Sequence, residues 1–535
     1  MKSELRIGIY CKGTTLPHWQ AQCLRHLAEQ QGVRFSVLAV PDVHDGAPPA
    51  GGMREALGTR LTELIIHRAA EAEDLSTMLG NLPMVWLKGS QPSPKELQAV
   101  QAHGVDVLLA LLPLPEDIAA GTDLPIWSFD VQGQPLSSSG LPVFARWMME
   151  PPPSSVALLC SGTGQRVSAT FTTRTNTDGV DMDAMLLGSA WLPVEMRRTW
   201  DATNTKRETH AEPLAKEASI ISLLFLWLSS EVRAATSGKP RPVHAGEWNI
   251  GIFPNPIQSL LDEDHNTNVR WLTSPSPGTH RLEPFGYQAA DGQLNVLYRK
   301  MDRLGGIDNI ARLRPKNDGN LKRSRTMLSA QAALSYPFVV QHGSDIHAIV
   351  SYPHQQRTEL FRVTETNDGL DHVKTLLDVA LINPTCVEYE GRWWIMGSDV
   401  DAPDGVLRAY HAPAFDGPYT AHVNNPVRIS GTGCRPAGTM FVHEGILWRP
   451  SLDNTDPRAP AVIFNRIVQL SPTTFQEEPG RTLTGFAGSI YGNGVSTICA
   501  MGDITIVDGL RHAPEAREIG PSERSPNRRS KAYEE

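Results

Sequence analysis

The sequence predicts an α/β domain with a mostly parallel sheet, followed by an all-β five-bladed propeller. Two observations carry this prediction. Between residues 5 and 130, short runs rich in Val, Ile and Leu alternate with amphipathic segments, as strands and helices do in an α/β layer. Between residues 283 and 511, one unit recurs five times: a start segment, a strand, a polar turn with Gly and a second apolar or aromatic strand. Repeats of about 50 residues are typical of propeller blades.

The first domain is expected to span residues 1–200. Its strands should be formed by LRIGIYCK, VRFSVLAVP, LPMVWLKG, VDVLLALL and LPIWSFD, and its helices include residues 18–30 and 53–72. The later segments VFARWMME, SVALLCSG and RVSATFTTR are expected to add strands at the edge of the sheet. Residues 201–245 are expected to form a linker with one docked helix, because the apolar run at 220–228 has only about half the length that a membrane span requires.

The propeller is expected to span residues 246–511, and residues 512–535 are expected to be a disordered tail because they lack apolar periodicity. The five start segments are LEPFGYQ, LSYPFVVQ, INPTCVEY, CRPAGTMF and GNGVSTIC. Each should begin the innermost strand of a blade, so their residues should face one shared central pocket. The early segment EWNIGIF is a candidate to pair with DITIVDGL and so close the ring.

Composition excludes several classes of function. A net charge of -9 gives no broad basic field, so nucleic acid is not an expected partner and an anionic membrane surface is a weak one. The six cysteines show no CxxC pair and no metal-ligand spacing, which predicts reduced thiols and no metal site. The segment MKSELRIGIY lacks the apolar run of a signal peptide, so a cytoplasmic location is expected. No GxGxxG after the first strand, Walker loop, HExxH or GxSxG motif occurs, and the sequence leaves any cofactor unknown.

Several long segments of the second half occur in one order: VRWLTSPSPGTHRLEPF, LSYPFVVQHGSDIHAIVSYP, NPTCVEYEGRWWIMGSD and CRPAGTMFVHEGILWRPSLDN. On these segments, residues 247–511 resemble the propeller domain of the glucosamine inositolphosphorylceramide transferase family. That domain is itself similar to the five-bladed propellers of arabinanase-like and fructosidase-like glycosidases. The resemblance implies a five-bladed fold and a carbohydrate-related function.

Glycosidase chemistry on such a propeller needs two or three carboxylates directed into the channel. The resemblance implies Ala-Asp-Pro-Phe at the first start segment, where this chain has LEPF with Glu283. It implies a Glu in the second blade, where Ser351 stands, and Asp-Pro-Thr at the third start segment, where Asn383 stands. An amide cannot transfer a proton at neutral pH, so standard two-carboxylate hydrolysis is not expected. Glu283 is the candidate catalytic residue of this half.

The remaining polar groups of the start segments can still bind a ligand. Ser351, Asn383, Arg435 and Asp453 offer charged and neutral hydrogen-bonding groups to polyol hydroxyls, and Trp394 offers an indole face on which a sugar could stack. The alternatives are that Trp394 packs in the core between blades and that Arg435 forms a structural salt bridge instead of clamping an anion.

The first domain more loosely resembles the formyltransferase-like fold that uses a folate one-carbon donor. The resemblance lies in the order of the elements, in LRIGIY and in LPIWSFD. That family needs an Asn-x-His motif and a later Asp to polarise the formyl carbonyl, whereas this chain has WSFD, which ends at Asp130. The later acids Asp178, Asp181 and Asp183 lie in a segment that reads as a loop. Asp130 is the candidate catalytic residue here, and a turn-forming role is its alternative.

Three functions stay open from the sequence. The first is a carbohydrate-directed protein of glycan, glycolipid or glycosylated-metabolite biosynthesis, whose propeller channel binds a sugar-like substrate for transfer rather than hydrolysis. The second is a repurposed enzyme of specialised metabolism that transfers a formyl or acyl group. The third is a non-catalytic scaffold. The expected partner is a small-molecule or glycan substrate.

Overall fold

The computed structural model describes residues 4–42, 68–88, 92–114, 122–131, 134–135, 154–161, 163–171, 180–200, 246–262, 268–302, 308–315, 324–330, 332, 334–364, 369–456 and 458–512. The predicted linker at 201–245, the predicted tail after 512, most of the predicted helix at 53–72 and the predicted strand VFARWMME therefore lie outside the described residues.

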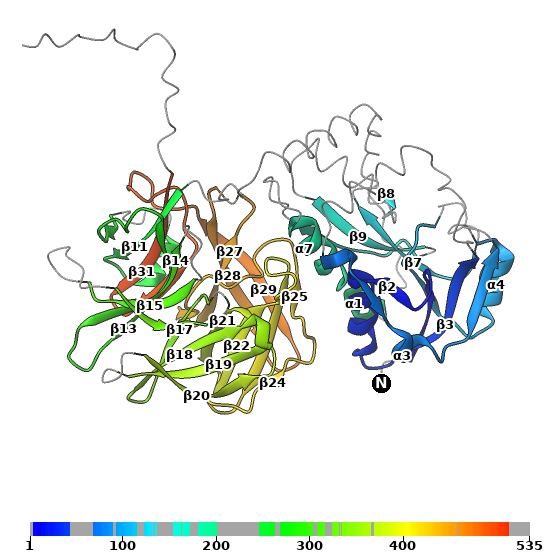
Figure 1. Cartoon of the computed structure of the whole chain (residues 1–535), viewed down its shortest axis with the longest axis horizontal. Helices are drawn as coiled ribbons and strands as arrows, with labels where there is room; N and C mark the ends of the chain where they lie inside the picture. Colours follow the sequence, from blue (N-terminus) through cyan, green and yellow to red (C-terminus); the bar gives the residue numbers. More distant parts are fainter. Residues whose placement is uncertain are drawn as a thin grey trace, which may run out of the picture.

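The first domain is built on one twisted sheet with strand order β10-β9-β7-β6-β1-β3-β5, and β8 pairs with β7 (Figure 1). The five strands from β7 to β5 in this order pair in parallel, and β9 and β10 add an antiparallel edge on the other side. The strands are β1 (Leu5–Tyr10), β3 (Val33–Asp42), β5 (Met84–Lys88), β6 (Val107–Ala110), β7 (Ile126–Val131), β8 (Gln134–Pro135), β9 (Ser154–Cys160) and β10 (Arg166–Phe171). The prediction of an α/β domain is confirmed.

Helices pack beside this sheet. They are α1 (His18–Ala28), α3 (Ser76–Leu79), α4 (Pro94–Gln101), α7 (Val180–Ser189), α8 (Leu192–Trp200) and the 3₁₀ turn η1 (Arg68–Ala70), and a small ribbon joins β2 (Thr15–Pro17) to β4 (Ala72–Asp74). Helix α4 begins where Ser93 and Glu96 form a capping box ahead of Pro94, the arrangement that satisfies free N–H groups at a helix start. The expectation of a loop around Asp183 is wrong: Asp183 lies in α7 and accepts the backbone N–H groups of Arg68 and Ala69.

The second domain is a five-bladed propeller (Figure 1). Blade 1 comprises β13 (Thr279–Gln288), β14 (Leu294–Asp302), β15 (Asn309–Leu313) and β16 (Arg325–Leu328), and blade 2 comprises β17 (Phe338–His342), β18 (Asp345–Tyr352), β19 (Arg357–Val363) and β20 (Leu370–Leu377). Blade 3 comprises β21 (Ile382–Tyr389), β22 (Arg392–Ser398), β23 (Val406–Ala412), β24 (Thr420–Ala421) and β25 (Arg428–Ile429), and blade 4 comprises β26 (Phe441–His443), β27 (Ile446–Asp453), β28 (Ala461–Leu470) and β29 (Phe475–Leu483). Blade 5 combines both ends of the domain.

The ring closes within blade 5. This sheet has the order β12-β11-β31-β30, from β12 (Arg270–Trp271), β11 (Gly246–Phe253), β31 (Ile504–His512) and β30 (Ile498–Met501). Strand β11 runs antiparallel to β31 along its whole length, from Gly246 opposite His512 to Phe253 opposite Thr505. The predicted pairing of EWNIGIF with DITIVDGL is therefore confirmed, and it joins the two ends of the ring by main-chain hydrogen bonds.

Alternation along the strands builds the core between blades. In β22, Trp393 and Ile395 belong to the apolar cluster shared with blade 2, whereas Trp394 and Met396 belong to the cluster shared with blade 4. Successive side chains of a strand point to opposite faces, and both faces of an inner blade strand are covered by neighbouring blades. This explains why the stretch WWIM within GRWWIMGS is continuously apolar rather than alternating with polar residues.

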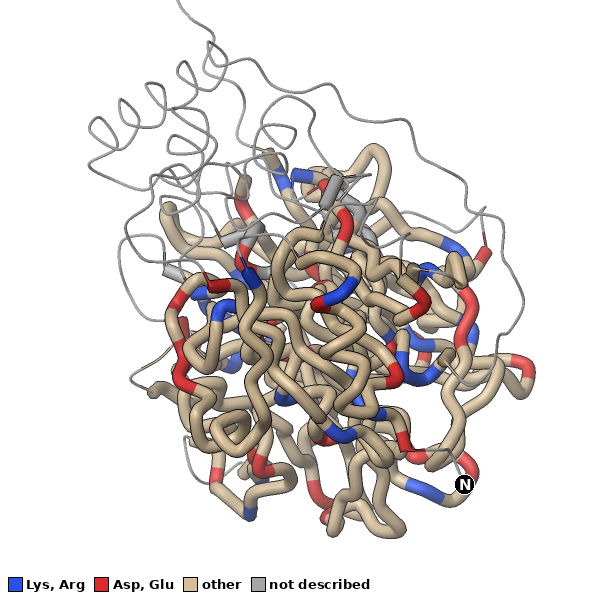
Figure 2. The backbone as a smooth tube through the Cα atoms, turned by 90° about the vertical axis from the view of Figure 1, so that its right-hand side faces the viewer, with Lys and Arg blue, Asp and Glu red and all other residues tan. Residues whose placement is uncertain are grey.

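The two domains are in contact on the side of the propeller where the innermost strands begin, which we call the upper face. The loop at residues 399–405 of blade 3 places Ala402 in the apolar core of the first domain. Arg68 pairs with Asp401 at 2.6 Å, and Arg198 donates to the carbonyl oxygens of Pro426 and Asn425 at 2.7 and 2.8 Å. Lys and Arg are interspersed with Asp and Glu over the backbone (Figure 2). In the part of the chain that is described, no helix is long and apolar enough to cross a membrane.

Candidate functional site

Three start segments share an unusual backbone conformation. Glu283, Tyr336 and Asn383 each precede a proline in successive blades, and each has a positive φ, of 53°, 50° and 54°. Strand register shifts around Glu283 and around Asn383. A positive φ is uncommon outside glycine, and such strained residues persist only where their surroundings hold them, most often at functional sites. The repeated geometry makes these positions the first place to look for a site.

A series of hydrogen bonds joins all five blades near the axis. Asp508 of blade 5 accepts the N–H of Glu283 in blade 1 at 3.0 Å, and Glu283 Oε2 accepts the N–H of Tyr336 in blade 2 at 2.7 Å. The Tyr336 hydroxyl then meets Thr385 Oγ1 of blade 3 at 3.0 Å and accepts the N–H of Gly438 in blade 4 at 2.7 Å. Tyr336 is fully buried. Its side chain therefore crosses the axis and fills it at this level.

Charge at the axis is largely paired within the protein. Glu283 is 5% exposed, and its Oε1 accepts from Arg299 at 3.3 Å, while Arg299 also pairs with Asp308 at 2.6 Å. Although burial opposes it, these two carboxylates raise the pKa of Arg299. Burial raises the pKa of Asp508 to about 6 in spite of the hydrogen bonds that it accepts. Both carboxylate oxygens of Glu283 have protein partners, so in the structure this side chain joins blade 1 to blade 2. Its catalytic role stays a prediction.

Between blades 3 and 4 the polar groups are less completely paired. Asn383 is 4% exposed and donates from Nδ2 to the Pro436 carbonyl at 2.7 Å, but its Oδ1 has no hydrogen-bond partner among the described residues. The same holds for the buried hydroxyl of Ser398 and for Nε of Arg435. Buried polar atoms are nearly always hydrogen-bonded, so an acceptor, a hydroxyl and a donor without partners indicate a place for a ligand or water.

The backbone brings these three residues close together. Asn383 contacts Pro436, which follows Arg435 directly, and Ser398 stands opposite Ile382 in the ladder between β21 and β22. Ser398 also alternates with Trp394 and Met396, so it faces blade 4 as Asn383 does. Sequence analysis found Asn383 and Arg435 but missed Ser398. Its only signal was its place at the end of a strand that is otherwise apolar.

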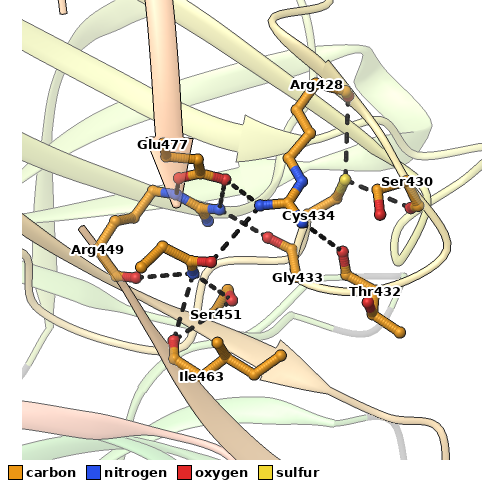
Figure 3. A network of polar contacts seen from close by, with 10 residues as sticks. Arg428, Ser430, Thr432, Gly433, Cys434, Arg449, Ser451, Ile463 and Glu477 are labelled. Carbon is orange, nitrogen blue, oxygen red and sulfur yellow. Dashed lines mark hydrogen bonds and ion pairs between the residues drawn. The ribbon is translucent and has the colours of Figure 1, made fainter. Parts of the chain in front are cut away.

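A buried ion network fixes the segment that leads into Arg435 (Figure 3). Glu477 of β29 is paired with Arg449 at 2.7 Å and with Arg428, and Arg449 also donates to the carbonyl of Gly433 at 2.6 Å. The side chains of Arg449 and Glu477 are 1% and 2% exposed. Although burial opposes it, the charges of the two arginines hold the pKa of Glu477 below its ordinary value. The network thereby joins the end of blade 3 to blade 4 and positions the fourth start segment.

The other predicted binding residues lie nearby but are engaged in contacts of their own. Ser351 Oγ accepts the N–H of Leu381 at 3.1 Å, within the connection that leads into blade 3. Asp453 ends β27 and accepts the N–H of Thr455 at 3.0 Å in a turn. Trp394 is 1% exposed in the core between blades 3 and 4, which leaves no open indole face for a sugar.

Arg435 and Asp130 complete the predicted set. Arg435 Nη1 lies 4.0 Å from Asp404, which makes a long ion pair, and the side chain of Arg435 is 18% exposed. Asp130 lies half-buried on β7, in the other domain from Glu283, so the structure does not bring the two predicted catalytic acids into one sheet or blade. Catalytic roles for Asp130 and Glu283 stay predictions. Of the predicted binding residues, Asn383 and Arg435 are brought together.

The second domain is thus a five-bladed propeller with a cluster of polar side chains, Asn383, Ser398 and Arg435, between its third and fourth start segments. The α/β domain lies against the upper face of this propeller. Residues 274–483 match the family model described as glucosamine inositolphosphorylceramide transferase 1, N-terminal. A stretch of 152 residues is 29% identical to glucosamine inositolphosphorylceramide transferase 1 of Oryza sativa subsp. japonica, over 27% of this chain and 20% of that protein. The protein of the same description from Arabidopsis thaliana is 25% identical over 262 residues, 44% of this chain and 34% of that protein.

Among solved structures, an exo-1,5-alpha-L-arabinanase from a bovine ruminal metagenomic library is similar with a TM-score of 0.31 and 11% identity, over 44% of this chain and 96% of that chain. By the family model and the curated relatives, the second half of this chain resembles the N-terminal region of the transferase family, as expected from the sequence. The chain matches about a third or less of the length of these curated relatives. The formyltransferase-like resemblance of the first domain stays a prediction.

Proposed function

We propose that this chain is a carbohydrate-directed protein of glycan, glycolipid or glycosylated-metabolite biosynthesis, whose propeller holds a sugar-like substrate for transfer rather than hydrolysis. The observation that carries the proposal is the set of polar atoms on Asn383, Ser398 and Arg435, between blades 3 and 4, that have no partner in the described part of the chain. A hydroxyl both donates and accepts, so neighbouring hydroxyls of a sugar ring complement an amide oxygen, a serine hydroxyl and a guanidinium N–H. The sequence match to transferases of a glycosylated lipid supports the same substrate class.

The residues near the axis argue against hydrolysis by two carboxylates. Such hydrolysis needs one carboxylic acid and one carboxylate free to act on the glycosidic bond. Here Glu283 accepts from Arg299 and Tyr336 through its two oxygens, and Asn383 is an amide. The propeller is therefore proposed to recognise and position a sugar acceptor. The family model that matches this region is described as the N-terminal part of the transferase.

Titration of the purified chain with inositol phosphates, hexosamines and nucleotide sugars tests the proposal. Asn383→Ala and Arg435→Ala should each weaken binding of the best of these ligands by about tenfold or more, which corresponds to about 1.4 kcal/mol. The matched controls Asn424→Ala and Arg458→Ala change exposed residues of the same blades and should leave binding unchanged. Absence of binding at millimolar ligand, or equal affinity in Asn383→Ala and Asn424→Ala, would contradict the proposal.

A further inference from the structure

A cavity of about 130 Å³ lies between the two domains, on the upper face of the propeller over blades 2 and 3. Its wall from the first domain comes from α1 and the region of α7, and its wall from the propeller comes from the turn after β18, the connection before β21 and the start of loop 399–405. It is separate from the place between blades 3 and 4 described above. Both domains are needed to enclose it.

The charged groups of this cavity already neutralise one another. Asp399 pairs with Arg408 at 2.7 Å, and against the cost of burial Arg408 holds the pKa of Asp399 below its ordinary value. Asp401 pairs with Arg68 at 2.6 Å. Burial lowers the pKa of His26 to about 3, so this imidazole is neutral near pH 7. Among the described residues, a ligand with a net charge would find no free counter-ion here, and an unpaired charge in a partly buried site costs several kcal/mol.

The aromatic wall is closed as well. The Trp191 ring stacks on His26 with a centroid distance of 3.5 Å, and the Arg408 guanidinium lies 5.0 Å from its centroid. These contacts take up the ring's capacity for stacking and cation–π interaction. Recognition inside the cavity is therefore left to its uncharged polar groups.

Two carboxamides face the cavity from opposite domains. Gln22 projects from α1, and its side chain makes no hydrogen bond with any described residue. Gln356 follows η3 (Pro353–Gln355) and donates from Nε2 to the Pro353 carbonyl at 3.1 Å, which leaves its Oε1 available as an acceptor. A free carboxamide can accept through its oxygen and donate through its nitrogen. The two side chains can thus bond hydroxyl groups from both sides.

We infer that this interdomain cavity is a second ligand site, which takes a small uncharged polyhydroxylated molecule, a polyol or a sugar, between Gln22 and Gln356. Such a molecule offers donors and acceptors in equal measure and brings no charge that the walls must compensate. The inference rests on the cavity and its carboxamides and is independent of the function proposed for the start segments. It also gives the first domain a role: it forms one wall of a binding site.

The test uses the full chain and two uncharged probes, myo-inositol and N-acetylglucosamine, with affinities measured by calorimetry and by saturation-transfer NMR. Gln22→Ala and Gln356→Ala should each weaken binding of the better probe by about tenfold. The matched controls are Gln101→Ala on α4 and Gln341→Ala on β17, both at exposed positions, and they should bind as the unchanged chain does. Adding a phosphate to the inositol should weaken its binding at this site.

Several results would overturn the inference. One is that neither probe binds at millimolar concentration. Another is that Gln22→Ala and Gln356→Ala bind normally while Asn383→Ala and Arg435→Ala lose affinity, since the ligand would then occupy only the place between blades 3 and 4. The converse result, loss in the glutamine variants alone, supports the interdomain site and counts against the proposed function. Thermal unfolding of each variant distinguishes a loss of binding from a loss of the folded structure.

Discussion

The Glu283 carboxylate accepts the backbone N–H of Tyr336 at 2.7 Å and so joins blade 1 to blade 2 beside the propeller axis. The sequence makes Glu283 a candidate catalytic acid because it stands where the resemblance implies the Asp of a glycosidase. In the structure it also holds Arg299 and lies 5% exposed. Joining the blades affects the stability of the propeller, whereas a catalytic role affects only activity, so substitutions of Glu283 can distinguish the two roles.

Replacing Glu283 with glutamine should destabilise the propeller. Glu283→Gln keeps an acceptor for Tyr336 but removes one of the two carboxylates on Arg299, which retains Asp308. Weakening a buried hydrogen bond to a charged group costs about 1–3 kcal/mol. Urea unfolding should show this loss relative to the control Glu388→Gln. Glu388 is exposed on β21, the innermost strand of blade 3. An unchanged midpoint of unfolding in Glu283→Gln, together with loss of the proposed sugar-transfer activity, would instead support a catalytic role for Glu283.

The stability of the propeller should fall as Asp508 ionises. Asp508 is fully buried, and its pKa is raised to about 6, above the value of about 3.9 for an unfolded aspartate. The folded state therefore binds this proton more tightly, so the contribution is fully present below pH 4 and is lost as pH rises through 6. A shift of about 2 units corresponds to about 3 kcal/mol.

The comparison with Asp508→Asn isolates this contribution, because asparagine has nearly the same shape and does not titrate. The free energy of unfolding is measured in urea for both proteins from pH 4 to pH 7. Between these two pH values the unchanged chain should lose about 2–3 kcal/mol more stability than Asp508→Asn does. Parallel stability curves would show that the four hydrogen bonds from Ser496, Thr497 and Glu283 keep the carboxylate ionised throughout.

Neighbouring glutamates of β29 should respond very differently to the same substitution. Glu477→Gln leaves the Arg449 guanidinium, 1% exposed, without its carboxylate, and breaking a buried pair in this way costs about 3–5 kcal/mol. Glu478 pairs with Arg466 at the surface, where its side chain is 54% exposed, so Glu478→Gln should cost less than about 1 kcal/mol. Denaturant unfolding of the two variants checks this, and equal losses would mean that the network in Figure 3 does not hold blade 4.

The sequence predicted the repeat and the ring closure because both depend on local patterns. Alternating apolar residues and turn glycines mark each blade. EWNIGIF has the composition of a strand, and in the structure it is β11, which pairs with β31. The same reasoning failed at α7, where the polar segment NTDGVDMDAM reads as a loop although residues 180–189 are helical. Tertiary packing against α1 and η1 overrides that local preference.

The candidate site was predicted only in part, for a physical reason. Asn383 and Arg435 could be found because both stand beside a proline at a repeated position. Ser398 could not, since its importance comes from the ladder that sets it opposite Ile382 and from the absence of a partner among the described residues. The cavity at Gln22 and Gln356 depends on how two domains dock, and no periodicity within either one encodes that contact.

Docking of the domains should be sensitive to one small residue. Ala402 is 2% exposed and packs into the core of the first domain, so Ala402→Arg must either bury a charge beside Arg68 or release the loop. Overpacking alone costs about 1–3 kcal/mol, and the added charge raises this cost. The radius of gyration from X-ray scattering should increase, and amide exchange in residues 399–405 should accelerate by about tenfold.

The matched control for this change is Ala414→Arg, at an exposed position of the same blade, which should leave scattering and exchange as they are. Because the interdomain cavity needs both walls, undocking should also abolish the binding of uncharged polyols by Ala402→Arg. Binding at the start segments needs only the propeller and should persist. If Ala402→Arg keeps the compact scattering profile and slow exchange, the contact through loop 399–405 does not hold the two domains together.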